Sequence, residues 1–113
     1  MITGIVIKGD GLGKRYGFPT ANLDCPKKNV KVKCGIYAAW VFFEHKKYIG
    51  ALVIQDKPWK VEVYILDFEG DLYGKYMEVD PVQKISEQQR YDSTEELIEK
   101  IRNDIEIVKK TLI

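Results

Sequence analysis

Four glycines stand within nine residues near the start of the chain, and two basic residues, Lys14 and Arg15, stand among them. Glycine adopts positive φ readily and lets backbone N–H groups approach a ligand closely. N–H groups and a lysine ammonium together suit a phosphate. The sequence therefore predicts a phosphate-binding loop whose glycines are Gly9, Gly11, Gly13 and Gly17.

Thr20 and Asn22 follow this loop directly. Pro19 fixes its own φ and pushes Phe18 into an extended conformation, so the loop should pass into a strand-like segment. Residues i and i+2 of such a segment face the same way, which presents the Thr20 hydroxyl and the Asn22 carboxamide together. Two neutral oxygens side by side are plausible Mg²⁺ ligands. The alternative is a surface turn in which both side chains bond only to the backbone.

Glu62 is the carboxylate most suited to proton transfer. It stands between Val61 and Val63 in an alternating stretch that predicts a strand over residues 60–66. Partial burial of a carboxyl group raises its pKa and makes it a usable proton acceptor near neutral pH. The alternative is an exposed glutamate paired with Lys60 or another lysine.

The segments that must position these residues are short and rich in β-branched and aromatic side chains. They are separated by tight turns, which indicates an antiparallel sheet of about six strands. Closure of this sheet into a small barrel would remove its edges. Besides the segment around Thr20, the predicted strands are residues 3–8, 35–43, 48–54, 60–66 and 72–82.

A single helix is predicted at the C-terminus. Ser93 and Glu96 have the spacing of a capping box, which marks a helix start. Apolar residues then recur at helical spacing over four to five turns, so this helix should pack its apolar face on the barrel. The apolar residues are Leu97, Ile98, Ile101, Ile105, Val108 and Leu112.

Length and composition indicate one globular domain over residues 1–113. Hydrophobic residues make up 45% and charged residues 31% of the chain, and the formal net charge is +1. This balance gives no electrostatic reason to expect a nucleic-acid or membrane partner. The apolar run at the N-terminus is too short for a signal peptide or a membrane span, so we expect a cytoplasmic protein. We also expect it to be a monomer. Cys25 and Cys34 are expected as reduced thiols.

Several motifs together resemble the riboflavin kinase family, in the same order along nearly the whole chain. The most specific is Phe-Pro-Thr-Ala-Asn-Leu at 18–23 combined with Val-Glu-Val at 61–63. The glycine loop before it, the start of the C-terminal helix and several short strand motifs are also similar. These further motifs are Gly-Ile-Tyr-Ala at 35–38, Leu-Asp-Phe at 66–68, Asp-Leu-Tyr-Gly at 71–74 and Tyr-Asp-Ser at 91–93.

The resemblance implies a mainly β fold, a closed six-stranded antiparallel Greek-key-type barrel with a C-terminal helix. It implies transfer of the γ-phosphoryl group of ATP to the 5′-hydroxyl of riboflavin, giving FMN and ADP. Glu62 matches the catalytic base, and Thr20 and Asn22 match the Mg²⁺ and phosphate ligands. The other nucleotide-binding positions are Gly9, Gly11, Gly13, Lys14, Leu66 and Phe68, and the flavin-binding positions are Val82, Ser86, Gln88 and Tyr91.

The chain departs from the family pattern mainly on the flavin side. The family often has Asn-Ile-Gly and then Arg-Pro, where this chain has Val-Ile-Gln at 53–55 and Lys-Pro at 57–58. It also has Ile-Ser-Glu-Gln at 85–88 in place of Ile-Arg-x-Glu, a segment that helps cover the flavin in the family. In the glycine loop, Lys14 replaces an arginine of the family. It keeps the positive charge but lacks the planar guanidinium group, which can bind a phosphate through two N–H groups. On the flavin side, Arg90 could substitute in part for the arginine that Ile-Ser-Glu-Gln lacks.

Two other functions are compatible with the same residues. A barrel could bind flavin or nucleotide without turnover, as a sensor or carrier, but such a protein needs no base at position 62. A small oligonucleotide-binding barrel would use the aromatic residues and the lysines of residues 27–33.

The length of 113 residues leads us to expect a kinase that stops at FMN, with no adenylyltransferase domain.

Overall fold

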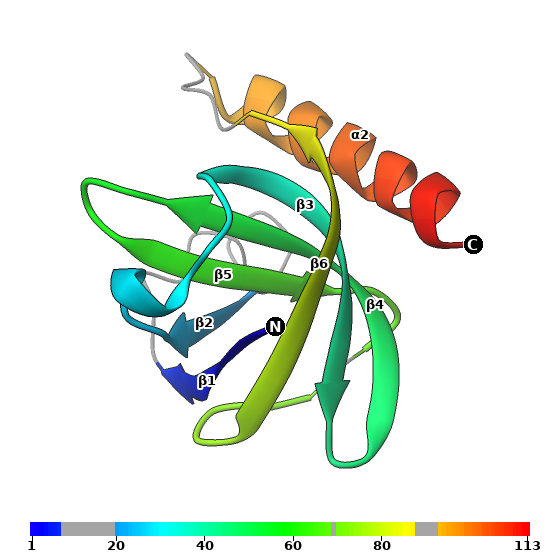
Figure 1. The fold of residues 1–113 in the computed structure, drawn as a ribbon. Coiled ribbons are helices and arrows are strands. Elements are labelled where there is room, and N and C mark those ends of the chain that lie inside the picture. Colours follow the sequence, from blue (N-terminus) through cyan, green and yellow to red (C-terminus); the bar gives the residue numbers. More distant parts are fainter. Residues whose placement is uncertain (8–19, 69, 88–92) are drawn as a thin grey trace.

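The fold is a closed antiparallel barrel with one helix on its outside (Figure 1). This computed structural model describes residues 1–7, 20–68, 70–87 and 93–113. The strands follow one another around the barrel in the order β1, β2, β5, β4, β3, β6, and β6 pairs with β1 to close it. Their bounds are β1 Ile2–Ile7, β2 Ala21–Asp24, β3 Gly35–Phe43, β4 Lys46–Gln55, β5 Lys60–Ile65 and β6 Tyr76–Ser86. A short 3₁₀ helix, η1 (Lys27–Asn29), follows β2, and α2 (Thr94–Leu112) ends the chain.

The topology confirms the predicted Greek key. β3, β4 and β5 are consecutive antiparallel neighbours, and β6 returns to lie beside β3 instead of continuing past β5. The tight turn between β3 and β4 places Glu44 and His45 at φ 50° and 64°. Two successive residues with positive φ match the right-handed twist of the strands that they join.

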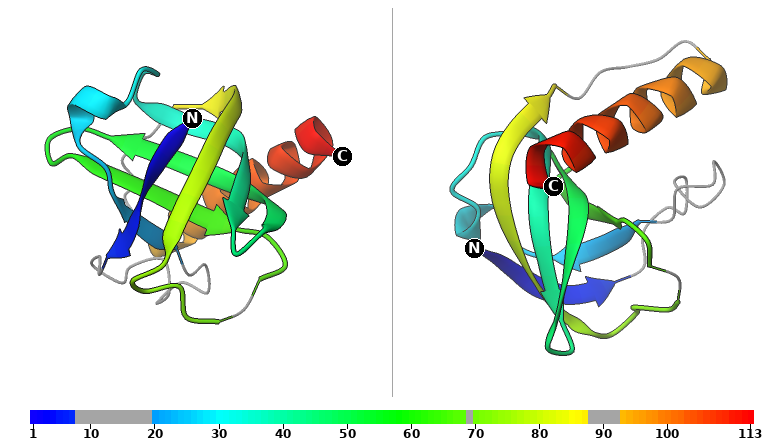
Figure 2. Two further views of the ribbon diagram at one scale, coloured as in Figure 1. Left: turned by 60° about the horizontal axis from the view of Figure 1, so that its bottom comes forward. Right: turned by 90° about the vertical axis from the view of Figure 1, so that its right-hand side faces the viewer.

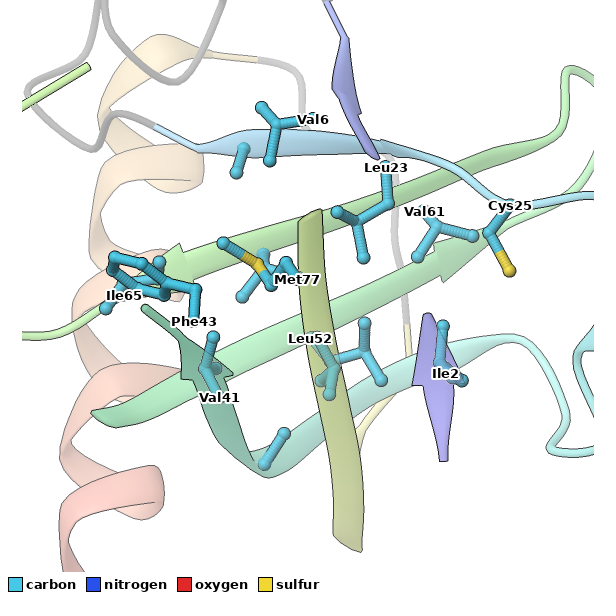
Figure 3. Packing of buried hydrophobic residues seen from close by; sticks show 14 of the residues in the cluster. Ile2, Val6, Leu23, Cys25, Val41, Phe43, Leu52, Val61, Ile65 and Met77 are labelled. Carbon is cyan, nitrogen blue, oxygen red and sulfur yellow. The ribbon is translucent and has the colours of Figure 1, made fainter. Parts of the chain in front are cut away.

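The barrel interior is filled by every second residue of each strand. On β5, Val61, Val63 and Ile65 are buried, while Lys60, Glu62 and Tyr64 on the opposite face are only half-buried. This is the alternation predicted from the sequence. Figure 3 shows Val61 and Ile65 of this strand in the interior together with Leu52 and Met77, from β4 and β6.

The strand predicted over residues 72–82 begins later and ends later than expected. The backbone N–H of Tyr73 donates to Asp71 Oδ1 at 2.9 Å, and Lys75 N donates to Leu72 O at 3.0 Å. With Gly74 at φ 83°, these bonds form a turn that delays the strand to Tyr76. β6 then continues past Pro81, which lacks an N–H, because a register irregularity next to it accommodates the missing donor.

The terminal helix begins where the capping box predicts. Ser93 is the N-cap, and its side chain accepts a hydrogen bond from Glu96 N at 3.2 Å. Val108 is fully buried and packs with Ala38 and Ala51, and Ile105 and Leu112 pack around them. α2 thus lies against the outer face of β3 and β4, on the side of the barrel away from β1 (Figure 2). Within the described residues, no helix is both long and apolar enough to cross a membrane.

Gly50 makes a testable contribution to the barrel. A Cβ at this position would lie 2.8 Å from the Tyr64 carbonyl oxygen and 2.8 Å from Val41 Cγ2. The carbonyl belongs to the paired strand and cannot withdraw cheaply, so Gly50→Ala should lower the free energy of unfolding by about 1–3 kcal/mol. Urea unfolding measures this loss. The exposed helix substitution Asn103→Ala is the control and should stay within about 0.5 kcal/mol of the parent.

Candidate active site

The three residues singled out for metal binding and proton transfer meet on neighbouring strands. β2 pairs with β5 so that Asn22 is directly in register with Glu62. Thr20, just before β2, donates a long hydrogen bond from Oγ1 to Glu62 Oε2, at 3.5 Å across 42 positions of sequence. All three side chains are half-buried. The pairing therefore brings a carboxylate beside two neutral side chains that each carry an oxygen.

Asn22 and Glu62 belong to a continuous row on the outside of the barrel, and Thr20 lies next to it. Each member is in register with the next. From Ile7 to Ile36 at least one neighbour along the strand lies in the interior, whereas Ile85, beside Ser86, packs in the cluster under α2. We call this the outer row, and its members, in order, are Ile7, Asn22, Glu62, Val53, Ile36 and Ser86. Two apolar side chains thus separate the Glu62 carboxylate from the Ser86 hydroxyl.

Ser86 is held by a network at the end of the outer row. Its Oγ donates to Asp104 Oδ1 of α2 at 3.0 Å, and Lys100 Nζ bonds both carboxylate oxygens of Asp104 at 2.8 and 2.9 Å. Asp104 was similar to the family pattern in the terminal helix but was not predicted from the sequence as a site residue. The available signal was Lys100, four residues earlier, at ion-pair spacing.

Nearby charge on β6 is also paired. Lys84 Nζ lies 2.5 Å from Glu87 Oε1, and this hydrogen bond raises the pKa of Lys84 above its ordinary value. Val82, another predicted flavin-binding position, is 49% exposed. β6 therefore presents an apolar side chain to solvent upstream of Ser86.

The two residues predicted at the adenine end lie in different clusters. Leu66 is buried under α2 beside Val108. Phe68 is half-buried and packs edge-on against Phe43 and Tyr48, with ring centroids 5.2 and 5.6 Å apart. Since Leu66 is covered by the helix, Phe68 is the more accessible of the two, and both assignments remain predictions.

Six of the predicted binding positions lie outside the residues that the structure describes. They are Gly9, Gly11, Gly13 and Lys14 of the phosphate-binding loop, and Gln88 and Tyr91 on the flavin side. The described residues on either side of the loop are Ile7 and Thr20, and Ile7 is in register with Asn22. The two described residues that flank the loop are therefore a member of the outer row, Ile7, and a neighbour of it, Thr20.

The two cysteines and Lys27 lie in the segment between β2 and β3, and Cys34 directly precedes β3. Cys25 is buried and Cys34 exposed, and both are free thiols. Burial raises the pKa of the Cys25 thiol. Lys27 pairs with Asp56 at 2.5 Å, and this contact raises the pKa of the lysine and lowers that of the aspartate. The ion pair between Lys27 and Asp56 therefore links η1 to the connection between β4 and β5.

Comparison with known proteins identifies relatives along the whole chain. RNA-binding riboflavin kinase RibR of Bacillus subtilis is 36% identical over 117 residues, which cover 97% of this chain and 50% of that protein. The bifunctional riboflavin kinase/FMN adenylyltransferase of Escherichia coli K12 is 37% identical over 110 residues, covering 91% of this chain and 35% of that protein. The chain thus spans half or less of the length of these relatives.

Solved structures show the same fold. Riboflavin kinase from Trypanosoma brucei superimposes with a TM-score of 0.77 at 24% identity, covering 98% of this chain and 75% of that one. A protein from Streptococcus pneumoniae described as a macrolide-efflux protein gives a TM-score of 0.89 at 27% identity, covering 96% of this chain and 38% of that one. The sequence model of the family described as "Flavokinase: Riboflavin kinase" matches residues 1–112. The chain therefore belongs to the riboflavin kinase family.

Proposed function

We propose that this protein transfers the γ-phosphoryl group of ATP to the 5′-hydroxyl of riboflavin, with residues 1–113 acting as one riboflavin kinase domain. The observation that carries this proposal is the meeting of Thr20, Asn22 and Glu62 at one point of the outer row. Family membership supports the reaction, and the register of β2 with β5 supports its assignment to this point of the outer row.

Phosphoryl transfer requires that the protein position donor and acceptor and stabilise charge on the phosphoryl group. It requires no covalent intermediate with the protein. Glu62 is the proposed catalytic base, which accepts the proton of the ribityl 5′-hydroxyl as the oxygen attacks phosphorus. Thr20 donates to Glu62 Oε2 and so orients that carboxylate. The carboxylate oriented in this way is the proposed acceptor for the hydroxyl proton.

The same residues fit a divalent cation. The Thr20 hydroxyl, the Asn22 carboxamide and the Glu62 carboxylate provide oxygen donors, which Mg²⁺ prefers, and no sulfur or imidazole competes among them. Thr20 and Asn22 are the proposed ligands. When bound, the ion neutralises negative charge on the phosphoryl oxygens.

The flavin is proposed to lie along the outer row, with its ribityl end at Glu62. Val53, which is half-buried, and Ile36, which is buried at 9% exposure, are then the apolar residues between the reacting end and Ser86, the proposed contact at the far end. Three strand spacings of about 4.8 Å each separate Glu62 from Ser86, a path suited to an extended ligand. Val82, Gln88 and Tyr91 are the other proposed flavin contacts. Phe68, Leu66 and the loop with Gly9, Gly11, Gly13 and Lys14 are proposed for the nucleotide.

A monomer that acts on small molecules is the proposed working state. In a closed barrel every strand is paired on both sides, which removes the free edges through which copies of a sheet protein can associate. The formal charge of +1 supplies no field for nucleic acid. Size-exclusion chromatography with light scattering measures the mass of the particle directly.

The reaction itself is tested by incubating purified protein with riboflavin, ATP and Mg²⁺ and separating the flavins by chromatography. We expect FMN to form, and to require both metal and nucleotide. Parallel mixtures with CTP and with EDTA identify the donor and the need for metal. Riboflavin binding without FMN under every condition would support the sensor or carrier function in place of the kinase.

A further inference from the structure

Asp104 is a charged side chain buried at the contact between α2 and the barrel. It is only 5% exposed, on the same helix face as Val108. A buried carboxylate is costly unless it is paired and hydrogen-bonded. Here Lys100 bonds both oxygens and Ser86 Oγ bonds Oδ1, so the cost is met by two partners. One of these partners, Ser86, lies on the outer row.

This contact determines which way the Ser86 hydroxyl can bond. A serine hydroxyl has one hydrogen to donate and two lone pairs that accept. A carboxylate ion-paired with a lysine is an acceptor only, so the hydrogen of Ser86 is directed to Asp104. Ser86 itself is half-buried, in contrast to Asp104. Toward a ligand on the outer row, Ser86 Oγ is therefore presented as a hydrogen-bond acceptor.

We propose that Asp104 is a positioning residue that commits Ser86 to accept a hydrogen bond from the flavin ring, from the N–H of its imide group. This inference rests on the proposed function, which places the ribityl end at Glu62 and the ring toward Ser86. The imide N–H, at N3, is flanked by two carbonyl groups that only accept. An acceptor with a fixed direction distinguishes the N–H from these neighbours, so the network sets the register of the ring along the row.

The test compares riboflavin with 3-methylriboflavin, in which a methyl group replaces the N3 hydrogen. Dissociation constants are measured by flavin fluorescence without nucleotide, for the parent protein and for Asp104→Asn and Ser86→Ala. The parent should bind 3-methylriboflavin about tenfold more weakly, as expected for loss of one hydrogen bond. In both variants the affinity for riboflavin should fall and the difference between the two ligands should shrink to about twofold.

Asp104→Asn is the decisive variant because it leaves the Ser86 side chain in place. In Asp104→Asn, a loss of discrimination between riboflavin and 3-methylriboflavin cannot result from extra space for the N3 methyl group, because no side chain has become smaller. The new amide can donate to Ser86 Oγ, which occupies a lone pair and frees the hydroxyl hydrogen. The KM for riboflavin should rise while kcat at saturating riboflavin stays within about twofold of the parent, since the network lies away from the reacting hydroxyl.

Val108→Ala is the control for helix docking. It removes apolar contact under α2 without touching the network, so it should lower the melting temperature and keep the discrimination between the two flavins. Equal discrimination in Asp104→Asn and the parent, or equal loss in Val108→Ala, would overturn the positioning role. A parent that makes FMN but binds both flavins equally also overturns it. A parent that binds neither flavin overturns the proposed function itself, and this inference with it.

Discussion

Glu62→Gln is expected to lower kcat for FMN formation by about 10²- to 10⁴-fold, the range that a general base typically contributes. Glutamine keeps the shape of the side chain and can still accept the hydrogen bond from Thr20, but it cannot take the hydroxyl proton. Dissociation constants for riboflavin and for the nucleotide should therefore change by no more than a few-fold. Single-turnover kinetics and flavin fluorescence separate the two effects.

A matched control for this substitution is Glu78→Gln. Glu78 is also a half-buried strand glutamate, but it lies on β6 in register with Thr3, away from Glu62. Its replacement should leave kcat near the parent value. Near-normal turnover in Glu62→Gln would remove Glu62 from the mechanism, and an equal loss in both variants would show that the effect is general to the barrel.

Thr20→Ala and Asn22→Ala are expected to raise the KM for Mg-ATP by about 10- to 100-fold, the usual cost of disturbing the groups around a bound metal. Each variant removes one of the two neutral side chains beside Glu62. Riboflavin affinity measured without nucleotide should stay close to the parent value. Titration with Mg²⁺ at fixed ATP should show a higher metal requirement in both variants.

Thr3→Ala and Asn29→Ala supply the corresponding controls. Both parent side chains are exposed, Thr3 on β1 and Asn29 on η1, and neither belongs to the outer row. These substitutions should leave the metal requirement unchanged. If Thr20→Ala and Asn22→Ala bind Mg-ATP like the parent, the metal assignment is wrong.

The barrel could be predicted from the sequence where local patterns determine the structure. Alternation over residues 60–66 set the inner and outer faces of β5 correctly, because a strand has a period of two. The predicted start of the strand at residue 72 was wrong because the turn there depends on a side chain, Asp71, which bonds the backbone of Tyr73. Such a bond competes with strand formation and leaves no periodic signal.

The candidate site could be proposed from the sequence as a set of residues but not as an arrangement. Thr20, Asn22 and Glu62 were identified from their chemistry and from the family resemblance. Their meeting depends on the pairing of β2 with β5, strands that are not neighbours in sequence, and no local pattern specifies that register. The link from Ser86 to Asp104 is likewise a tertiary contact between β6 and α2.

The alternation of β4 and β5 separates two kinds of side chain that selection could change independently. Leu52 and Val63 point into the barrel, while Val53 and Glu62 lie on its outside. A library of interior variants would therefore sample thermal tolerance without altering the composition of the outer row. Laboratory evolution of this fold can accordingly proceed in two rounds: first a more stable interior, and then changes at outer positions such as Val53, where the flavin is proposed to lie.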